Sequence, residues 1–294
     1  MTYPDPGMSA RFSPSQRGIF YMVLAAMFFS SMDAVAKGLV AHYPVVQVVW
    51  ARNVLQVLAV VILVSQFGGV ANLKTKYPLN HVIRSVFQIL TVSLFFASLV
   101  HIGLAEASAL ADTNPVLITL GAALFLGERL TRQRLIAVFV ALIGALIILR
   151  PGMGVFTPAA LLPLACAVAY AGNALMTRKI GIHEAAWTSL FYGALFGSLI
   201  TSLALPFVWT NVQPADFWRF GLLGVLGTGA QWAAIRAFSL AEAGVIAPFG
   251  YVGILFATFW GWALFDQIPD QATIVGALVI IGAGLYVWSQ DRSK

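Results

Sequence analysis

The chain has 294 residues, of which 60% are hydrophobic and 10% are charged, with a formal net charge of +6 and a mean hydropathy of +0.87. A soluble domain carries about 25% charged residues, so this composition excludes a water-soluble globule and predicts an all-α integral membrane protein. The single cysteine, Cys166, excludes an intramolecular disulfide and a cysteine-rich metal site. Continuous apolar runs such as residues 190–208 lack the alternating polarity of a transmembrane barrel.

Apolar runs separated by short turns predict ten transmembrane helices, because about 20 residues cross the roughly 30 Å of hydrocarbon in a bilayer. Residues 1–17 form a polar, proline-rich N-terminal segment without the apolar core of a signal peptide. Residues 290–294 form a short C-terminal tail. In chain order, the expected spans are residues 18–41, 45–67, 80–102, 105–127, 132–149, 158–179, 184–208, 217–239, 243–265 and 270–289.

Lysine and arginine are distributed unevenly between the two sets of loops. With a cytoplasmic N-terminus, thirteen of the 17 fall in inside segments, Arg84 among them, while Arg150 and Arg219 fall outside and Lys37 and Arg52 lie within helices. This asymmetry follows the positive-inside rule, so we expect both termini in the cytoplasm and the chain in a bacterial inner membrane. Anchoring in the bilayer explains the basic charge, and we expect no nucleic-acid partner.

One segment of the sequence occurs twice, as LAEASALADTNP at residues 104–115 and LAEAGVIAPFGY at residues 240–251. Each copy leads through an apolar helix and a short acidic turn to a glycine-bearing final helix. The chain therefore divides into a first five-helix repeat at residues 18–149 and a second at residues 158–289. Because five is odd, the second repeat must enter the membrane from the opposite side, as in the inverted repeats of secondary transporters.

These features resemble the drug/metabolite transporter superfamily in its ten-helix EamA-type branch, over nearly the whole chain. The resemblance rests on the paired halves, the turn LFLGE ending at Glu128, Arg52 in the second helix, and Asp33 and Asn173 in the two opening helices. Within the branch, the chain is most similar to bacterial aromatic amino acid exporters. Asp266 departs from the pattern, which has glutamate there, and Asn173 is not an acid, so a coupling acid is not implied in the second half.

Charged side chains inside a span cost about 2.5–3.5 kcal/mol on insertion scales, so each requires a partner or a water-filled cavity. Asp33 and Lys37 lie four residues apart, either as a self-neutralising pair or as contacts for a zwitterionic substrate. Arg52 either holds Asp33 as a bidentate partner or attracts a substrate carboxylate. Asp112 either caps local N–H groups or contacts the substrate.

Two prolines lie at corresponding places in the two halves and are candidates for helix bends or gating: Pro115 and Pro248. Uncharged polar and aromatic side chains within spans serve either as interhelical hydrogen bonds or as substrate contacts. These candidates are Gln88, Tyr170, Asn173, Tyr192, Gln231, Trp232 and Tyr251. Small residues at Gly193/Gly197 and Gly253/Ala257/Gly261 favour close packing within one chain, so we expect a monomer rather than a dimer.

The sequence contains no HExxH, GxSxG, DDxxD or Walker A motif, so we expect no catalytic residues, no metal and no cofactor. An intramembrane enzyme, the alternative from a different class, has no supporting motif. The polar candidates suit a compact polar molecule with an apolar side chain. We therefore expect a secondary transporter that exports neutral, aromatic and other hydrophobic amino acids by alternating access. A multidrug exporter or another metabolite exporter of the same superfamily is the alternative.

Overall fold

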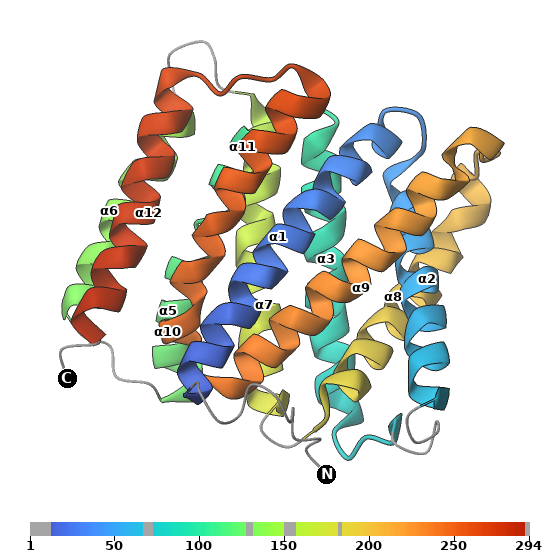
Figure 1. The fold of residues 1–294 in the computed structure, drawn as a ribbon, viewed down its shortest axis with the longest axis horizontal. Helices are drawn as coiled ribbons and strands as arrows, with labels where there is room; N and C mark the ends of the chain where they lie inside the picture. Colours follow the sequence, from blue (N-terminus) through green and yellow to red (C-terminus); the bar gives the residue numbers. More distant parts are fainter. Residues whose placement is uncertain (1–12, 67–72, 128–131, 150–156, 182–183, 292–294) are drawn as a thin grey trace.

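The computed structural model describes residues 13–66, 73–127, 132–149, 157–181 and 184–291, and within these ranges it is helical (Figure 1). Glu128, which carries part of the family resemblance, lies outside them. The α-helices are α1 (Pro14–Val40), α2 (Val45–Gln66), α3 (Pro78–Leu99), α4 (Leu104–Ala111), α5 (Asn114–Leu126), α6 (Arg132–Leu149), α7 (Leu161–Gly181), α8 (Ala186–Val208), α9 (Phe217–Leu240), α10 (Ala243–Ile246), α11 (Val252–Phe265) and α12 (Gln271–Asp291). Short 3-10 helices are η2 (Pro158–Ala160), η3 (Pro214–Asp216) and η4 (Ala247–Tyr251).

Within the described ranges these helices make ten membrane crossings, because α4 and α5 form one broken span and α10, η4 and α11 form another. Six described segments are long and apolar enough by themselves to cross a bilayer, and two shorter apolar helices follow at Phe249–Phe265 and Gln271–Ala283. The prediction of ten helices in two repeats agrees with this architecture.

Both broken spans are interrupted inside the repeated LAEA segments. Asp112 is the C-cap of α4, and α5 begins immediately afterwards with Pro115 in its first turn, where the missing N–H of proline is tolerated. In the second half, α10 gives way to η4, which contains Pro248. The sequence repeat is therefore also a structural repeat. Both prolines lie at helix breaks, and their role in gating stays a prediction.

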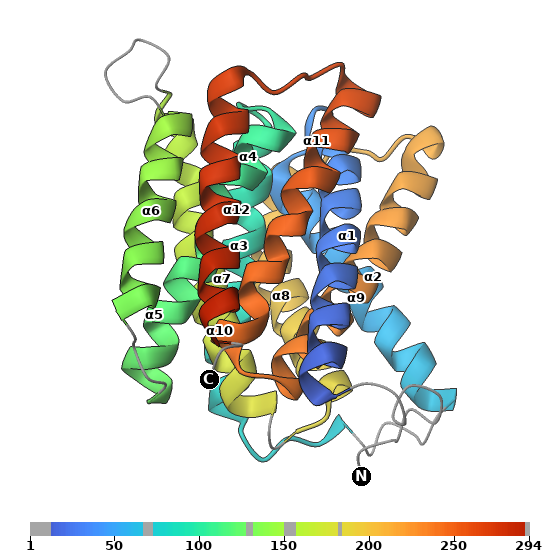
Figure 2. The same cartoon turned by 60° about the vertical axis from the view of Figure 1, so that its left-hand side comes forward.

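The two halves pack through reciprocal pairs of helices. The first helix of each half contacts the third helix of the other, so α1 packs on α9 and α7 packs on α3. The second helices, α2 and α8, pair at one end of the molecule, and the fifth helices, α6 and α12, pair at the other end (Figures 1 and 2). This exchange of partners is what a twofold relation between inverted repeats requires.

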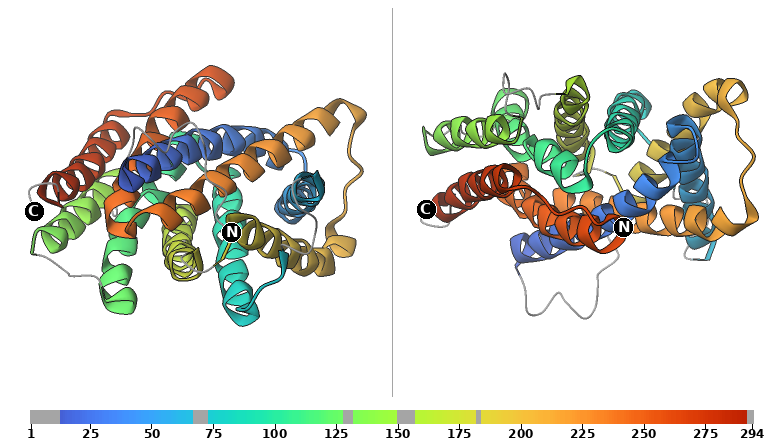
Figure 3. Two further views of the ribbon diagram at one scale, coloured as in Figure 1. Left: turned by 60° about the horizontal axis from the view of Figure 1, so that its bottom comes forward. Right: turned by 90° about the horizontal axis from the view of Figure 1, so that it is seen from above.

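The start of α1 and the end of α12 lie at the same end of the molecule (Figure 1), as an even number of crossings requires. Viewed from above, the pairs α2–α8 and α6–α12 flank a central group that contains α1, α3 and α7 (Figure 3). Large apolar side chains are exposed on the outside, with Phe207 87% and Phe125 79% exposed. Such a surface fits hydrocarbon rather than water.

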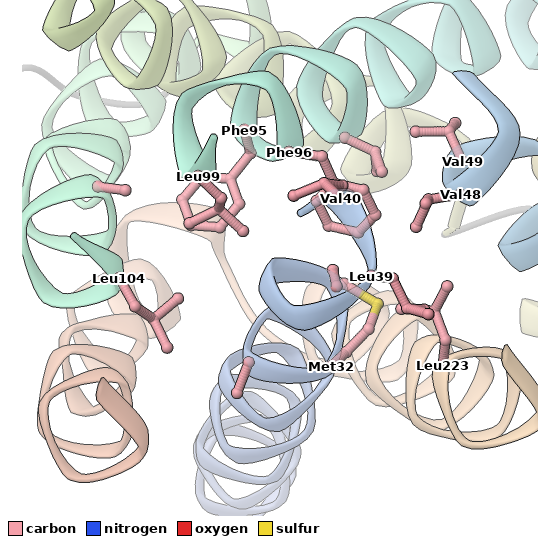
Figure 4. Packing of buried hydrophobic residues seen from close by; sticks show 14 of the residues in the cluster. Met32, Leu39, Val40, Val48, Val49, Phe95, Phe96, Leu99, Leu104 and Leu223 are labelled. Atoms are coloured by element: carbon pink, nitrogen blue, oxygen red, sulfur yellow. The ribbon is translucent and has the colours of Figure 1, made fainter. Parts of the chain in front are cut away.

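Apolar side chains from α1, α2, α3 and α9 form one continuous core, part of which Figure 4 shows. Leu39, Phe96 and Leu223 are fully buried there. Small residues of α8 allow this helix to approach α2 and α3 closely. A Cβ on Gly193 would lie 2.6 Å from Oε1 of Gln88, and one on Gly197 would lie 2.6 Å from Nδ2 of Asn53. The glycine spacing predicted from the sequence therefore serves packing within the chain.

The expected orientation can be tested with single cysteines in a Cys166→Ala background. Ala215, exposed between α8 and α9, should react as cysteine with a membrane-impermeant maleimide in intact cells. Lys179, exposed at the end of α7, should react as cysteine only after permeabilisation, because the basic loops are expected inside. Labelling with the opposite pattern would reverse the orientation.

Candidate functional site

A cavity of about 140 Å³ lies between α1, α3, the broken span α4–α5, α7, α9 and the start of α11. Most of its wall is apolar, with Met22, Phe29, Phe95, Phe96 and Phe238 among the lining side chains. Polar side chains enter from both halves of the chain. Six candidates from the sequence line it together: Asp33, Gln88, Asp112, Tyr170, Asn173 and Gln231.

Two carboxylates line this cavity, Asp33 from α1 and Asp112 from the break after α4. Neither accepts a hydrogen bond or forms a direct ion pair with another described residue. Asp112 uses its backbone N–H to bond the carbonyl of Ser108 at 2.8 Å, and its side chain does not cap the neighbouring helix. An unpaired carboxylate away from bulk water is costly, so these groups are suited to bind a cation.

The two basic candidates point elsewhere. Arg52 is fully buried, and its Nε–H donates to the sulfur of Met32 at 3.2 Å, while Nη1 donates to Oδ1 of Asn53 at 3.2 Å. Its charge attracts Asp33 without a direct ion pair.

Lys37 does not pair with Asp33 either. Its Nζ donates to the carbonyls of residues 99 and 102, at 3.0 and 2.8 Å, at and just after the end of α3, where carbonyls lack helical partners. No lysine or arginine of the described ranges lines the cavity.

Carboxamides supply further polar groups of the wall. Gln88 is 3% exposed, and neither its Nε2 nor its Oε1 has a hydrogen-bond partner among the described residues. Oδ1 of Asn173, on α7, is also unpartnered. A buried amide without a hydrogen-bond partner destabilises the folded protein, and a ligand or water molecule that bonds the amide offsets this cost. These amide atoms are buried behind the cavity surface in this structure, so a substrate can bond them only after the wall rearranges.

The sequence matches the model described as the EamA-like transporter family twice, over residues 16–150 and 157–289. The chain belongs to this family. The predicted membership of the drug/metabolite transporter superfamily is confirmed. Because the family and the relatives are transporters, this chain is a multi-pass membrane transporter of small metabolites and not an enzyme.

The names of similar proteins refer to several different substrates. The pseudopaline exporter of Pseudomonas aeruginosa is 34% identical, and the match covers 90% of this chain and 94% of the exporter. The riboflavin transporter of Vibrio cholerae is 27% identical over 98% of both chains. An S-adenosylmethionine uptake transporter of Rickettsia prowazekii is 25% identical over 94% of both. A crystal structure at 20% identity, with a TM-score of 0.70, covers 95% of this chain and 98% of that chain and shows the same fold.

The other aromatic candidates of this EamA-like transporter do not line the cavity. Tyr192 stacks on His81 with ring centroids 5.1 Å apart, and Trp232 packs edge-on against Tyr21 at 5.4 Å. Tyr251 is buried in η4, where its hydroxyl has no partner among the described residues. These three side chains therefore do not form part of the cavity wall.

Arg84 was not among the site candidates from the sequence, where it was counted with the inside segments. The side chain is fully buried in α3, where Nε donates to Oγ1 of Thr177 and Nη1 donates to the carbonyl of Ser189, both at 2.8 Å. The available signal was its spacing, since Arg84 precedes Gln88 by four residues and shares its helix face.

Glu184 joins the segment before α3 to the turn before α8. Its carboxylate accepts hydrogen bonds from Nε2 of His81 at 2.6 Å, from the hydroxyl of Thr75 at 2.6 Å and from the backbone N–H of Lys76 at 2.8 Å. Burial alone would raise the pKa of Glu184, but these hydrogen bonds outweigh it and hold the pKa below its ordinary value. The network fastens α3 to α8 outside the cavity.

This depressed pKa predicts pH-dependent stability. The contribution of Glu184 is complete above the ordinary glutamate pKa of about 4.3 and is lost as the pH falls through the lower pKa of the folded state. Glu184→Gln should therefore lower the melting temperature of the purified protein at pH 7, and the difference from wild type should shrink below about pH 4. Glu242→Gln, at an exposed position, is the control and should change nothing. A difference independent of pH would contradict the prediction.

The contrast between Asp33 and Lys37 predicts opposite effects of two substitutions. Asp33→Asn removes a charge that has no direct partner, so protein yield and melting temperature should stay near wild type while transport falls about tenfold or more. Lys37→Met removes two hydrogen bonds between α1 and the end of α3, so it should lower the melting temperature. Loss of folded protein in Asp33→Asn would assign the carboxylate a structural role.

Proposed function

We propose that this transporter exports compact molecules with a protonated amine and an apolar body, chiefly neutral amino acids with aromatic or other large side chains. The observation that carries the proposal is that two carboxylates without a direct ion-pair partner, Asp33 and Asp112, line the cavity. No described lysine or arginine lines it. An ammonium group gives these carboxylates charge-assisted hydrogen bonds. The phenylalanine side chains of the wall offer apolar surface and ring faces to the rest of the substrate.

The volume of the cavity favours a small substrate. Its 140 Å³ is similar to the engineered cavity of about 150 Å³ that holds benzene. One aromatic ring with a short polar end is of this size, whereas a riboflavin molecule would require a much wider space. The size therefore favours amino acids over the larger molecule that the riboflavin transporters carry.

Alternating access is the mechanism that two inverted repeats support. Both broken spans contribute to the cavity wall, through Asp112 and Asn114 in one half and Gly250 and Gly253 in the other. Movement at these breaks would change access to the cavity from the two sides in turn. We place the protein, as a monomer, in the bacterial inner membrane with both termini in the cytoplasm. Export is the direction named for the relative with 34% identity.

A second candidate substrate is pseudopaline or a similar metabolite. The observation that favours it is the 34% identity to pseudopaline exporters over 90% of this chain. The two candidates can be compared in a single assay.

Counterflow in proteoliposomes tests the proposal. Vesicles loaded with unlabelled phenylalanine or methionine should accumulate the labelled amino acid above the level of empty vesicles, because one cavity serves both directions of exchange. Asp33→Asn vesicles should not accumulate it. If neither amino acid exchanges while pseudopaline, a lipophilic cation or a nucleotide sugar does, the amino acid assignment is wrong.

A further inference from the structure

Arg84 is a buried cation without a described counter-ion. The side chain is 0% exposed, and no described carboxylate lies within ion-pair distance of it. Two of its nitrogens donate to neutral oxygens of Thr177 and Ser189, and Nη2 has no partner among the described residues. Arg52, by comparison, is attracted by the nearby Asp33, although the two form no direct ion pair. An unbalanced guanidinium in an apolar interior destabilises the folded protein, so its presence indicates a function that offsets this cost.

Arg84 does not line the cavity, but it lies next to Gln88, which does. Its Nη1 and Oε1 of Gln88 lie against the same residue of α8, since a Cβ on Gly193 would be 2.8 Å from the first and 2.6 Å from the second. Gln88 reaches from there into the cavity wall, and its Nε2 is an unpartnered donor. The guanidinium and the carboxamide therefore meet at Gly193, and each has one unpartnered donor, Nη2 and Nε2.

A second route leads through α7. Thr177, which accepts the hydrogen bond from Nε of Arg84, lines a small pocket between α7 and α9. The pocket has a volume of about 10 Å³, and it shares Tyr170, Asn173 and Gln231 with the main cavity. It therefore lies next to the cavity and is lined by the residue that accepts a hydrogen bond from Arg84, and it has room for about one water molecule.

We propose that Arg84 and Gln88 form an anion-binding subsite that takes the carboxylate of an amino acid substrate. This inference rests on the proposed function, in which Asp33 and Asp112 hold the ammonium group. The cavity then has opposite charges at its two ends and selects zwitterions over simple amines. Nε2 of Gln88 and Nη2 of Arg84 are both buried in this structure, so the carboxylate reaches them when the wall beside Gln88 opens during transport. A bidentate guanidinium suits a carboxylate, whereas lysine would give only a point charge.

Substrate selectivity tests this subsite. Transport of phenylalanine should be compared with transport of phenylalaninamide, which keeps the ring and the ammonium group but has no carboxylate. Arg84→Gln should raise the KM for phenylalanine about tenfold or more and change the KM for phenylalaninamide less than about twofold. Arg84→Lys should lie between wild type and Arg84→Gln. Arg219→Gln, a partly exposed arginine that pairs with Asp216, is the matched control and should behave as wild type. Equal losses for both substrates, or no change for either, would overturn the subsite.

Stability separates this role from a purely structural one. Removing an unbalanced buried charge relieves its desolvation cost, so Arg84→Gln should melt at or above the wild-type temperature. Loss of folded protein in Arg84→Gln and Arg84→Lys would show that the arginine only fastens α3 to α7 and α8, and the subsite would be wrong.

A binding measurement keeps the subsite independent of transport. Phenylacetate should raise the melting temperature of the purified wild type, and 2-phenylethanol, which lacks the negative charge, should not. Arg84→Gln should remove the effect of phenylacetate. If phenylacetate binds in this way while no amino acid is transported, the proposed function fails and the subsite stands. If phenylacetate does not stabilise the wild type, the subsite is overturned.

Discussion

A bilayer offers no water to polar groups at its centre, and this constraint explains where the chain of this transporter is irregular. Helix breaks at membrane depth are tolerated only where they are buried in protein or line a cavity. Both breaks, after α4 and around η4, meet this condition because both border the central cavity. Asp112 lies at the first break, and Asp33 lines the same cavity from α1. The two carboxylates and the broken backbone therefore share one polar space inside an otherwise apolar protein.

The two repeats provide a symmetric frame with an asymmetric lining. Reciprocal packing of α1 on α9 and of α3 on α7 gives each half the same relation to the other. Both acids of the wall come from the first half, whereas the second half contributes uncharged polar side chains, with Asn173 at the place that corresponds to Asp33 in the sequence repeat. Inverted repeats allow the frame to exchange conformations. The proposed preference for a cation rests on this difference between the side chains of the two halves.

Much of the fold follows from the sequence, because hydropathy fixes which residues lie in the membrane and proline marks where a helix cannot continue. The break at Pro115 and the ten crossings are predicted on these grounds. The direction of each side chain around its helix is harder to predict, since membrane helices are apolar on most sides. Asp33 and Lys37 share a helix face, yet one lines the cavity and the other bonds carbonyls after α3.

The burial of Arg84 is also difficult to predict from the sequence. Arg84 lies six residues after Pro78, near a predicted loop, and the positive-inside rule counts it as a surface charge. Only the packing of α3 against α7 and α8 buries it. The carboxamides were predicted as a group, but their lack of partners depends on distances that no sequence pattern gives. Sequence therefore predicts the candidate residues of this site better than it predicts their roles.

Cys166 gives the most direct test of the central claim, because the chain's single cysteine lines the cavity. The rate of its alkylation by membrane-permeant N-ethylmaleimide can be measured on the purified wild type with and without phenylalanine. A substrate whose ammonium group lies between Asp33 and Asp112 should cover the thiol, so phenylalanine should slow alkylation in the wild type and should not slow it in Asp33→Asn. Equal rates with and without phenylalanine in the wild type, or protection that persists in Asp33→Asn, would contradict a substrate site built on these carboxylates.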